Sequence, residues 1–442
     1  MTFLRKSCFF QKKVVPLHSK MKEIWKNSAR LLTANVFAQA IGLLVYPILT
    51  RLYSPDDFGL FNLFLSIGGI LVLCSTAEYQ NAIVLPKEQK KANALFHVGA
   101  GLVLGMTLVA LLSVPFSRPI ANLFNTPSLA RWYWLMPIYV LVMGGWVLLN
   151  YYYTREKAFQ RISGYQVSQS VLSAGSKVGF GYAGFLSGGL IVGSVLAPLI
   201  SFIISVLRAG KKWLGGLLHL NIQECKQVAK EYANFPKFAL PRSLINSLGG
   251  NLPILLLTPF FSLSEIGYFG MALTLGFRPL NMISGSLCQT FFQQTADAIN
   301  HRRPIFSFFR NFILWSLLIL CLSFAALYFI LPWLTGWLLG SGWEETGELI
   351  RVLLPWLAVS TVSASLGFVS DVFGKQKMSA IIEFTYTGLR ALAIGVGIWS
   401  QDFRLAIITY SLVGLLVQSF LLVWYLVLAK SYDNGILMNK AE

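Results

Sequence analysis

The sequence contains few charged residues. Only 12% of its 442 residues are charged, 55% are hydrophobic and the mean hydropathy is +0.62, whereas about a quarter of the residues in a soluble domain are charged. This excludes a soluble enzyme. At about 20 residues per crossing, the apolar residues suffice for about a dozen helical membrane spans. The connections between spans are too short to hold a sizeable soluble domain.

Cysteine and histidine are also scarce. The five cysteines are scattered, with no CxxC pair and no Cys/His cluster: Cys8, Cys74, Cys225, Cys288 and Cys321. They indicate neither a disulfide framework nor a metal site, and we expect no cofactor. The four histidines fall outside the apolar runs or at their ends, so no proton relay is expected among them.

Twelve apolar runs, bounded by charge or by Gly and Pro, predict the membrane spans. They lie near 31–50, 59–82, 93–114, 132–153, 162–184, 188–207, 239–261, 265–293, 308–331, 349–370, 378–398 and 403–428. We expect an all-α polytopic membrane protein with an N-lobe (27–207), a cytoplasmic linker (208–238) and a C-lobe (239–428). A basic tail (1–26) and a short C-terminal tail (429–442) flank the lobes, and Met21 is an alternative start of the chain.

Positive charge is distributed asymmetrically. The chain has 36 Lys and Arg against 18 Asp and Glu, a net charge of +18. If the N-terminus is cytoplasmic, 27 of these cations fall on the inside and only five on the outside, which is the positive-inside pattern. It accounts for most of the net charge without a nucleic-acid partner. Both termini are therefore predicted to be cytoplasmic.

Four cations fall inside predicted spans: Lys177, Arg242, Arg278 and Arg390. Each would cost about 2.5–3.5 kcal/mol near the bilayer centre unless it faces water or a partner. Polar residues at helical spacing accompany them, and these stripes predict one hydrated, anion-binding cavity. We expect its lining to include Asn35, Gln39, Gln169, Ser173, Asn246, Asn281 and Thr387, with Arg30 and Arg51 at its mouths.

Two of these assignments have alternatives. Arg242 stands a few residues inside its span, so a cavity position and snorkelling to the interface are both open. Glu383 lies two turns from Arg390, and the two side chains could pair with each other. Glu383 is also the carboxylate we expect to be well buried, and is therefore the candidate for coupling to an ion or proton.

An internal repeat relates the two halves. A shift of 208 positions aligns RLYSPDDFGLFNLFLSIGG (51–69) with PFFSLSEIGYFGMALTLGF (259–277). Five identities result, and Asp57 meets Glu265: Ser54, Gly59, Phe61, Leu65 and Gly68 match Ser262, Gly267, Phe269, Leu273 and Gly276. Because six spans separate equivalent helices, the repeats are parallel, a design in which transporters bind substrate between two lobes.

The stretch SARLLTANVFAQAIGLLVYPILTRLYSPDDFGLFNLFLSIGGIL (28–71), followed by EYQNAIVLPK (78–87), resembles the opening of Wzx-type polysaccharide and O-antigen flippases. YANFPKFALPRSLINSLGGNLPILLLTPFFSLSEIGYFGMALTLGFRPL (232–280) is similar to the start of that family's second lobe. These flippases belong to the multidrug/oligosaccharidyl-lipid/polysaccharide (MOP) superfamily. The resemblance implies a MATE-like fold of two six-helix lobes in a V.

The resemblance also implies a function, which is not catalytic. The protein would translocate undecaprenyl-pyrophosphate-linked glycan across the bacterial inner membrane by alternating access, with Lys177, Arg242, Arg278 and Arg390 in the central cavity. The lipid tail would stay among membrane lipids, and other polysaccharide-assembly membrane proteins are the expected partners. A drug or organic-cation antiporter of the same superfamily, or a membrane-embedded polymerase or ligase, is the alternative. The antiporter would need a carboxylate in the first or seventh span, and neither contains one.

Overall fold

The computed structural model describes residue 33, residues 36–209 and residues 221–441. Within these residues every regular element is helical, which confirms the all-α membrane fold. The basic tail 1–26, Arg30, Asn35 and part of the linker lie outside the described residues.

The helices follow the order of the predicted spans. They are α2 (Tyr46–Leu52), α3 (Pro55–Thr76), α4 (Tyr79–Ala82), α5 (Gln89–Ser113), α6 (Ser117–Leu123), α7 (Ser128–Trp132), α8 (Met136–Arg155), α9 (Phe159–Tyr182), α10 (Leu186–Ala209), α12 (Ile222–Glu231), α13 (Leu240–Leu257), α14 (Leu263–Asn300), α15 (Phe306–Leu339), α16 (Glu344–Ser365), α17 (Val369–Val372), α18 (Gln376–Trp399) and α19 (Phe403–Ala441). Two 3₁₀ turns, η1 (Val114–Phe116) and η2 (Tyr133–Leu135), and one π-helical turn, η3 (Phe235–Ala239), join some of them.

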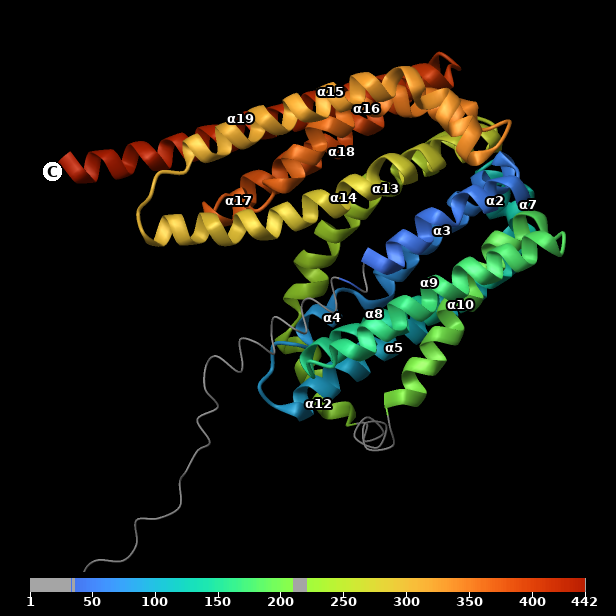
Figure 1. Ribbon diagram of the computed structural model, residues 1–442. Coiled ribbons are helices and arrows are strands. Elements are labelled where there is room, and N and C mark those ends of the chain that lie inside the picture. Colours follow the sequence, from blue (N-terminus) through green and yellow to red (C-terminus); the bar gives the residue numbers. More distant parts are fainter. Residues whose placement is uncertain (1–32, 34–35, 210–220, 442) are drawn as a thin grey trace, which may run out of the picture.

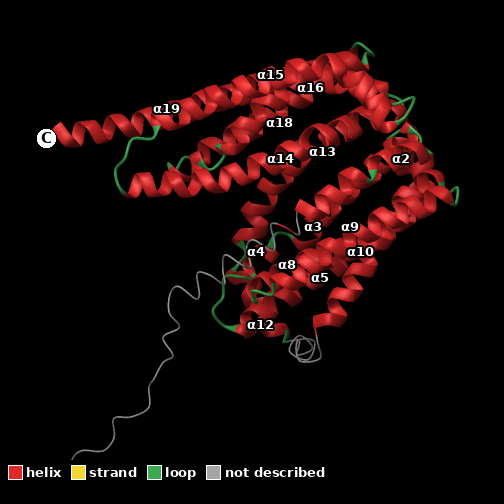
Figure 2. Cartoon of the chain, viewed as in Figure 1, coloured by secondary structure: helices red, strands yellow, loops and turns green. Residues whose placement is uncertain are grey.

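The helices form two bundles arranged as a V (Figure 1). We name residues 36–209 the N-lobe and residues 240–441 the C-lobe. The lobes meet where α3 and α14 begin, and we call this the closed end. They diverge toward α4, α12 and α17, which mark the open end. Most connections between the long helices are short (Figure 2).

Eight helical segments of the described chain are long and apolar enough to cross a membrane. They are Pro55–Thr76, Gln89–Leu123, Ser128–Arg155, Leu186–Arg208, Phe306–Leu339, Glu344–Val372, Gln376–Trp399 and Phe403–Ile436. The helix Val36–Leu52 is apolar but shorter. Helices α9, α13 and α14 are absent from this group, and they carry Lys177, Arg242 and Arg278. The count of twelve spans therefore stays a prediction.

The internal repeat is visible at the start of α3 and α14. In α3 the Ser54 Oγ accepts a hydrogen bond from Asp57 N (3.3 Å), and the Asp57 carboxylate accepts one from Ser54 N (2.9 Å). In α14, Ser262 and Glu265 form the same capping box with the same two distances. Each box satisfies two free N–H groups of its helix terminus. The aligned residues thus have the same local structure, as the repeat predicts.

The two repeats cross through glycine. A Cβ on Gly59 would collide with the backbone carbonyl of Leu263, and a Cβ on Gly267 would collide with that of Pro55. The two contacts are equivalent in the repeat, because Gly59 aligns with Gly267 and Pro55 aligns with Leu263. Across the same crossing, Ser264 Oγ donates to Asp56 Oδ1 at 2.8 Å. Only glycine permits this backbone approach, so the crossing defines the closed end.

Side chains around Trp343 complete the closed end. The Trp343 indole N–H donates to Thr50 O (3.1 Å), and Thr50 Oγ1 donates to Leu339 O (2.7 Å). The Trp343 ring also packs edge-on against Phe58 and Tyr268, at centroid distances of 5.2 and 5.7 Å. Since Trp343 is only 2% exposed, these contacts seal the closed end with residues of both lobes.

The connector helix α12 packs on the N-lobe at the open end. Val228 is buried there against α5 residues such as Leu95, and Tyr79 OH donates to Ala229 O (2.9 Å). Lys91 and Glu231 form an ion pair at 2.9 Å. The connector is thus held by the N-lobe and delivers the chain through η3 to α13.

Candidate functional site

Three cavities lie along the space between and inside the lobes. The N-lobe cavity, of about 490 Å³, is bounded by α2, α3, α9 and α14. The C-lobe cavity, of about 600 Å³, is bounded by α14, α16, α18 and α19. The open-end cavity, of about 890 Å³, lies between α4, η3, α13 and α18. The structure therefore has three cavities where one was expected; Arg278 lines the N-lobe and C-lobe cavities, and Glu383 lines the C-lobe and open-end cavities.

The N-lobe cavity is lined mainly by amides and hydroxyls. Its polar lining comprises Gln39, Asn62, Tyr139, Gln166, Gln169, Ser170, Ser173, Lys177, Ser194 and Arg278. The buried Asn62 Nδ2 and Gln166 Oε1 have no hydrogen-bond partner within the described residues. Buried polar atoms are normally paired with protein, water or ligand. The lining of this cavity is therefore rich in hydrogen-bonding groups.

Lys177 is the cation that α9 projects into this cavity. Its Nζ lies 4.8 Å from the Phe61 ring centroid, and Tyr53 OH anchors the helix by donating to Lys177 O at 2.6 Å. No carboxylate of the described chain forms an ion pair with it. Lys177 is thus a half-buried ammonium held over an aromatic face, with its charge not neutralised by the protein.

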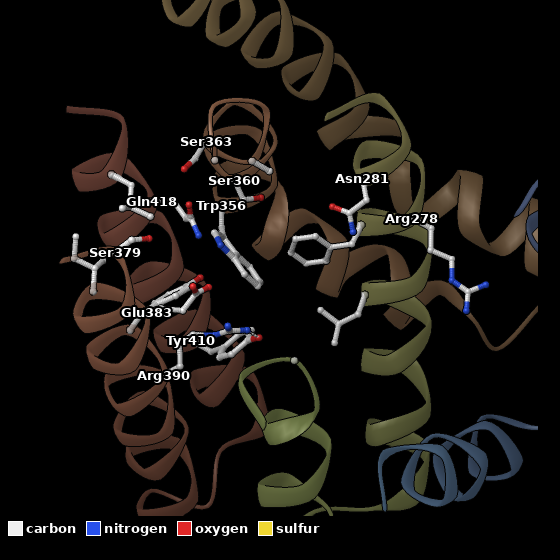
Figure 3. Close-up of a pocket in the computed structure, with 18 of the residues that line it drawn as sticks. Arg278, Asn281, Trp356, Ser360, Ser363, Ser379, Glu383, Arg390, Tyr410 and Gln418 are labelled. Atoms are coloured by element: carbon white, nitrogen blue, oxygen red, sulfur yellow. Dashed lines mark hydrogen bonds between the residues drawn. The ribbon is translucent and has the colours of Figure 1, made fainter. Parts of the chain in front are cut away.

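Arg278 extends from α14 of the C-lobe toward the N-lobe. Its guanidinium carbon lies 5.8 Å from the Tyr46 ring centroid, and the side chain points away from the other labelled residues of the C-lobe cavity (Figure 3). It lines the N-lobe cavity together with Lys177. Like Lys177, it has no ion pair within the part of the chain that the structure describes. Two unpaired cations, one from each lobe, therefore face one cavity.

Arg390 has a different environment in the C-lobe cavity. Its guanidinium carbon lies 4.5 Å from the Tyr410 ring centroid, 4.7 Å from that of Tyr386 and 5.3 Å from that of Trp356. Nη2 donates to the Tyr410 hydroxyl, which lies beside it in Figure 3. Cation–π contacts stabilise a partly desolvated guanidinium. Arg390 is therefore enclosed by the C-lobe's own side chains.

The expectation that Glu383 is the well-buried carboxylate is wrong. Glu383 is exposed and faces the C-lobe and open-end cavities, because α18 turns this part of its surface toward them. No ion pair joins it to Arg390 in the described chain. Glu78 is the buried acid instead, at 5% exposure. It lies in the turn between α3 and α4, where the side chains of Gln80 and Asn81 donate to its carboxylate.

The other expected residues fall into separate groups. Gln39, Gln169 and Ser173 line the N-lobe cavity, Asn281 lines the C-lobe cavity, and Arg242 and Asn246 line the open-end cavity. Thr387 lines none of the three; its Oγ1 donates to Glu383 O (3.0 Å) and faces Gly249 of α13. Arg51 lies at the closed end, where it donates to Pro47 O (2.9 Å) and Trp337 O (3.4 Å).

The sequence pattern did not predict several of the lining residues. Asn62 on α3 and Gln418 on α19 line the cavities from otherwise apolar helices, and a lone amide in an apolar span was a usable signal. The aromatic lining, Trp356, Tyr386 and Tyr410, had no such signal. Aromatic residues are common in membrane helices. Nothing in their spacing shows that rings from α16, α18 and α19 surround Arg390.

The fold is that of MOP-superfamily transporters. A lipid II flippase, MurJ in an inward closed conformation, matches with a TM-score of 0.70 at 12% identity, over 92% of this chain and 90% of that chain. A multidrug MATE-family transporter in an inward-facing conformation matches with a TM-score of 0.66 at 12% identity, over 90% and 96%. A eukaryotic MATE transporter matches with a TM-score of 0.53 at 11% identity, over 95% and 99%. At this identity the likeness concerns the fold alone.

A family model described as "Polysaccharide biosynthesis protein" matches residues 48–348. The chain belongs to this family, as its resemblance to the Wzx-type exporters predicted. No curated protein matches the chain. It is thus a multi-pass membrane protein of a polysaccharide biosynthesis family.

Proposed function

We propose that the protein is a flippase that moves undecaprenyl-pyrophosphate-linked oligosaccharide across the cytoplasmic membrane by alternating access. The glycan would serve O-antigen, capsule or exopolysaccharide assembly. The observation that carries the proposal is the N-lobe cavity, where Lys177 and Arg278 face amides and hydroxyls without a neutralising carboxylate. Family membership and the MOP fold support it.

The chemistry of the cavity matches the two parts of this headgroup. Pyrophosphate is a compact multiple anion, and a guanidinium can bind its oxygens in a bidentate manner while an ammonium adds a point charge. Arg278 and Lys177 supply one group of each kind. Gln39, Gln169 and Ser173 offer donors and acceptors for sugar hydroxyls, while the lipid tail would remain in the bilayer.

The charge distribution supports an orientation. Lys87 lies just before α5 and Lys90 and Lys91 lie in its first turn, where Lys91 pairs with Glu231 of α12 at the open end. Cations are enriched in cytoplasmic loops. The V would then open to the cytoplasm, with both termini on that side. This state would receive the lipid-linked glycan, and other polysaccharide-assembly membrane proteins would take it up outside.

A drug or organic-cation antiporter is the second candidate. Glu383 and the rings of Trp356, Tyr386 and Tyr410 line the C-lobe cavity, and an acid with aromatic rings suits an organic cation. Arg390 among the same rings opposes that ligand by like-charge repulsion. The charge of the C-lobe cavity thus favours the flippase.

The test is leaflet-resolved measurement of lipid-linked glycan in cells that lack the protein. We expect the glycan to accumulate on the cytoplasmic side, and wild-type protein to restore surface polysaccharide. Arg278→Ala should abolish this rescue, because an anion contact is lost, and Arg278→Lys should restore part of it. Lys375→Ala, an exposed cation outside the three cavities, is the control and should rescue fully.

Two outcomes would refute the proposal. Unpolymerised glycan on the outer leaflet would point to a polymerase or ligase. Normal glycan display combined with increased sensitivity to cationic drugs would point to the antiporter.

A further inference from the structure

The open-end cavity brings charged residues of both lobes together. Glu78 and Asn81 line it from the N-lobe, while Arg242, Asn246 and Glu383 line it from the C-lobe. The η3 turn between α12 and α13 contributes Phe235 and Phe238. The cavity thus lies where the two lobes face each other across the opening of the V.

Glu78 is an unusual residue in this cavity. It is 5% exposed, and it is the only charged side chain that is buried among the described residues. Its Oε2 accepts hydrogen bonds from Gln80 Nε2 (3.1 Å) and from the Asn81 side chain. Both donors are neutral, and no cation of the described chain pairs with this carboxylate. A buried carboxylate without a counter-ion is costly.

The backbone holds Glu78 in place at a further cost. Ala77 and Glu78 both adopt left-handed conformations, with φ of 45° and 64°, and this pair separates α3 from α4. Non-glycine residues in this region are strained, and such strain persists where the surrounding structure enforces it, commonly at functional sites. Buried Tyr79 and Gln80 follow directly. The turn therefore fixes a carboxylate at the opening.

Arg242 supplies the opposite charge from the other lobe. It lies in the first turn of α13, is exposed to the cavity, and has no ion pair within the described ranges. Glu383 faces the same cavity, but it belongs to the same lobe as Arg242. A contact between those two residues would not report on the distance between lobes. The Glu78–Arg242 pair joins a residue of the N-lobe to a residue of the C-lobe.

We propose that Glu78 and Arg242 form an inter-lobe ion pair that closes the open end when the transporter faces outward. The inference rests on the proposed function, because it assumes that the lobes alternate about the closed end. In the open state each charge lacks its partner. Approach of the lobes would pair them, and the Coulomb energy gained would offset their desolvation. Arg242 would then act in gating, and Lys177 and Arg278 in substrate binding.

The test measures the distance between the lobes without substrate. In the full-length protein with its cysteines replaced, Lys87→Cys and Lys377→Cys place spin labels on exposed residues of the N-lobe and C-lobe near the open end. Double electron–electron resonance in lipid nanodiscs then gives the populations of long and short distances. We expect a short-distance population that falls about tenfold in Glu78→Gln and in Arg242→Gln, equivalent to about 1.4 kcal/mol.

A double-mutant cycle distinguishes a pair from two independent effects. Glu78→Gln with Arg242→Gln should be no more open than either single variant, and Arg242→Lys should retain most of the short-distance population. Asp371→Asn, which changes an exposed carboxylate on α17 outside the three cavities, is the matched control and should leave it unchanged. Additive effects of the two substitutions, or an unchanged population in Glu78→Gln, would overturn the inference.

This experiment is independent of the identity of the substrate. If lipid-linked glycan does not accumulate on the cytoplasmic side while the double-mutant cycle shows coupling between Glu78 and Arg242, the ion pair closes a transporter of another substrate. If glycan transport is confirmed while the double-mutant cycle shows no coupling, the proposed flippase function is supported and the proposed ion pair is refuted.

Discussion

The two lobes have the same local structure at the closed end, where they contact each other, but their cavities have different linings. At the closed end, α3 and α14 carry the same capping box and the same glycine, and each glycine faces a carbonyl of the other lobe. In the cavities, Lys177 of the N-lobe projects among amides and hydroxyls. Arg390 of the C-lobe lies among three aromatic rings.

This difference indicates a division of roles. A backbone crossing at the closed end tolerates little change, because any side chain there separates the helices. The cavities carry no such restriction, and each lobe fills its own with different chemistry. The N-lobe cavity leaves its cation available to a ligand, whereas the C-lobe uses its rings to hold Arg390. Substitutions should therefore affect stability at the crossing and at Arg390, and transport at Lys177.

Gly59→Val and Gly267→Val should have the largest effect. A side chain at either position collides with the backbone of the opposite lobe, and overpacking against backbone should cost about 3 kcal/mol or more. We expect loss of monodisperse protein in detergent and a lower Tm. Gly69→Ala is the control on α3, since a Cβ there meets nothing within 4 Å. A Gly59→Val protein as stable as this control would contradict the crossing.

Arg390→Gln and Lys177→Gln should separate stability from transport. Loss of the Arg390 contacts with three rings should destabilise the C-lobe by about 2–4 kcal/mol, seen as a lower Tm. Lys177→Gln should leave Tm within a few degrees and reduce surface polysaccharide at least about tenfold, because a charge–phosphate contact is lost. If both variants lowered Tm equally, Lys177 would be as important to the stability of the fold as Arg390, and the two cavities would not differ in role.

Gln169→Ala and Ser173→Ala should have the smallest effects. Each removes one hydrogen-bonding group from the N-lobe cavity, worth about 0.5–1.5 kcal/mol, so transport should fall about threefold to tenfold. The initial rate of glycan translocation in proteoliposomes measures this. Ser168→Ala, on the same helix but outside the N-lobe cavity, should transport normally. Equal losses in Ser168→Ala would indicate a general effect on α9.

Much of the fold followed from the sequence because membrane helices have strong signals. Apolar runs predicted the helix order, and Ser54, Gly59 and their counterparts Ser262 and Gly267 predicted the repeat. The site was predicted less completely. A cation within a span must face something polar, so Lys177 and Arg278 could be assigned to cavities. The aromatic enclosure of Arg390 and the exposure of Glu383 depend on neighbouring helices.

Composition, the periodicity of polar residues and the internal repeat determined that this chain enters the membrane as two repeated sets of helices with cations along their polar faces. Tertiary structure alone decided which groups those faces meet: the carbonyl opposite each glycine at the closed end, the rings around Arg390, and the surroundings that bury Glu78 at the turn between α3 and α4. The physical reason is that a helical period defines the direction of a side chain relative to its own axis. The partner on the other side depends on how separate helices pack against one another.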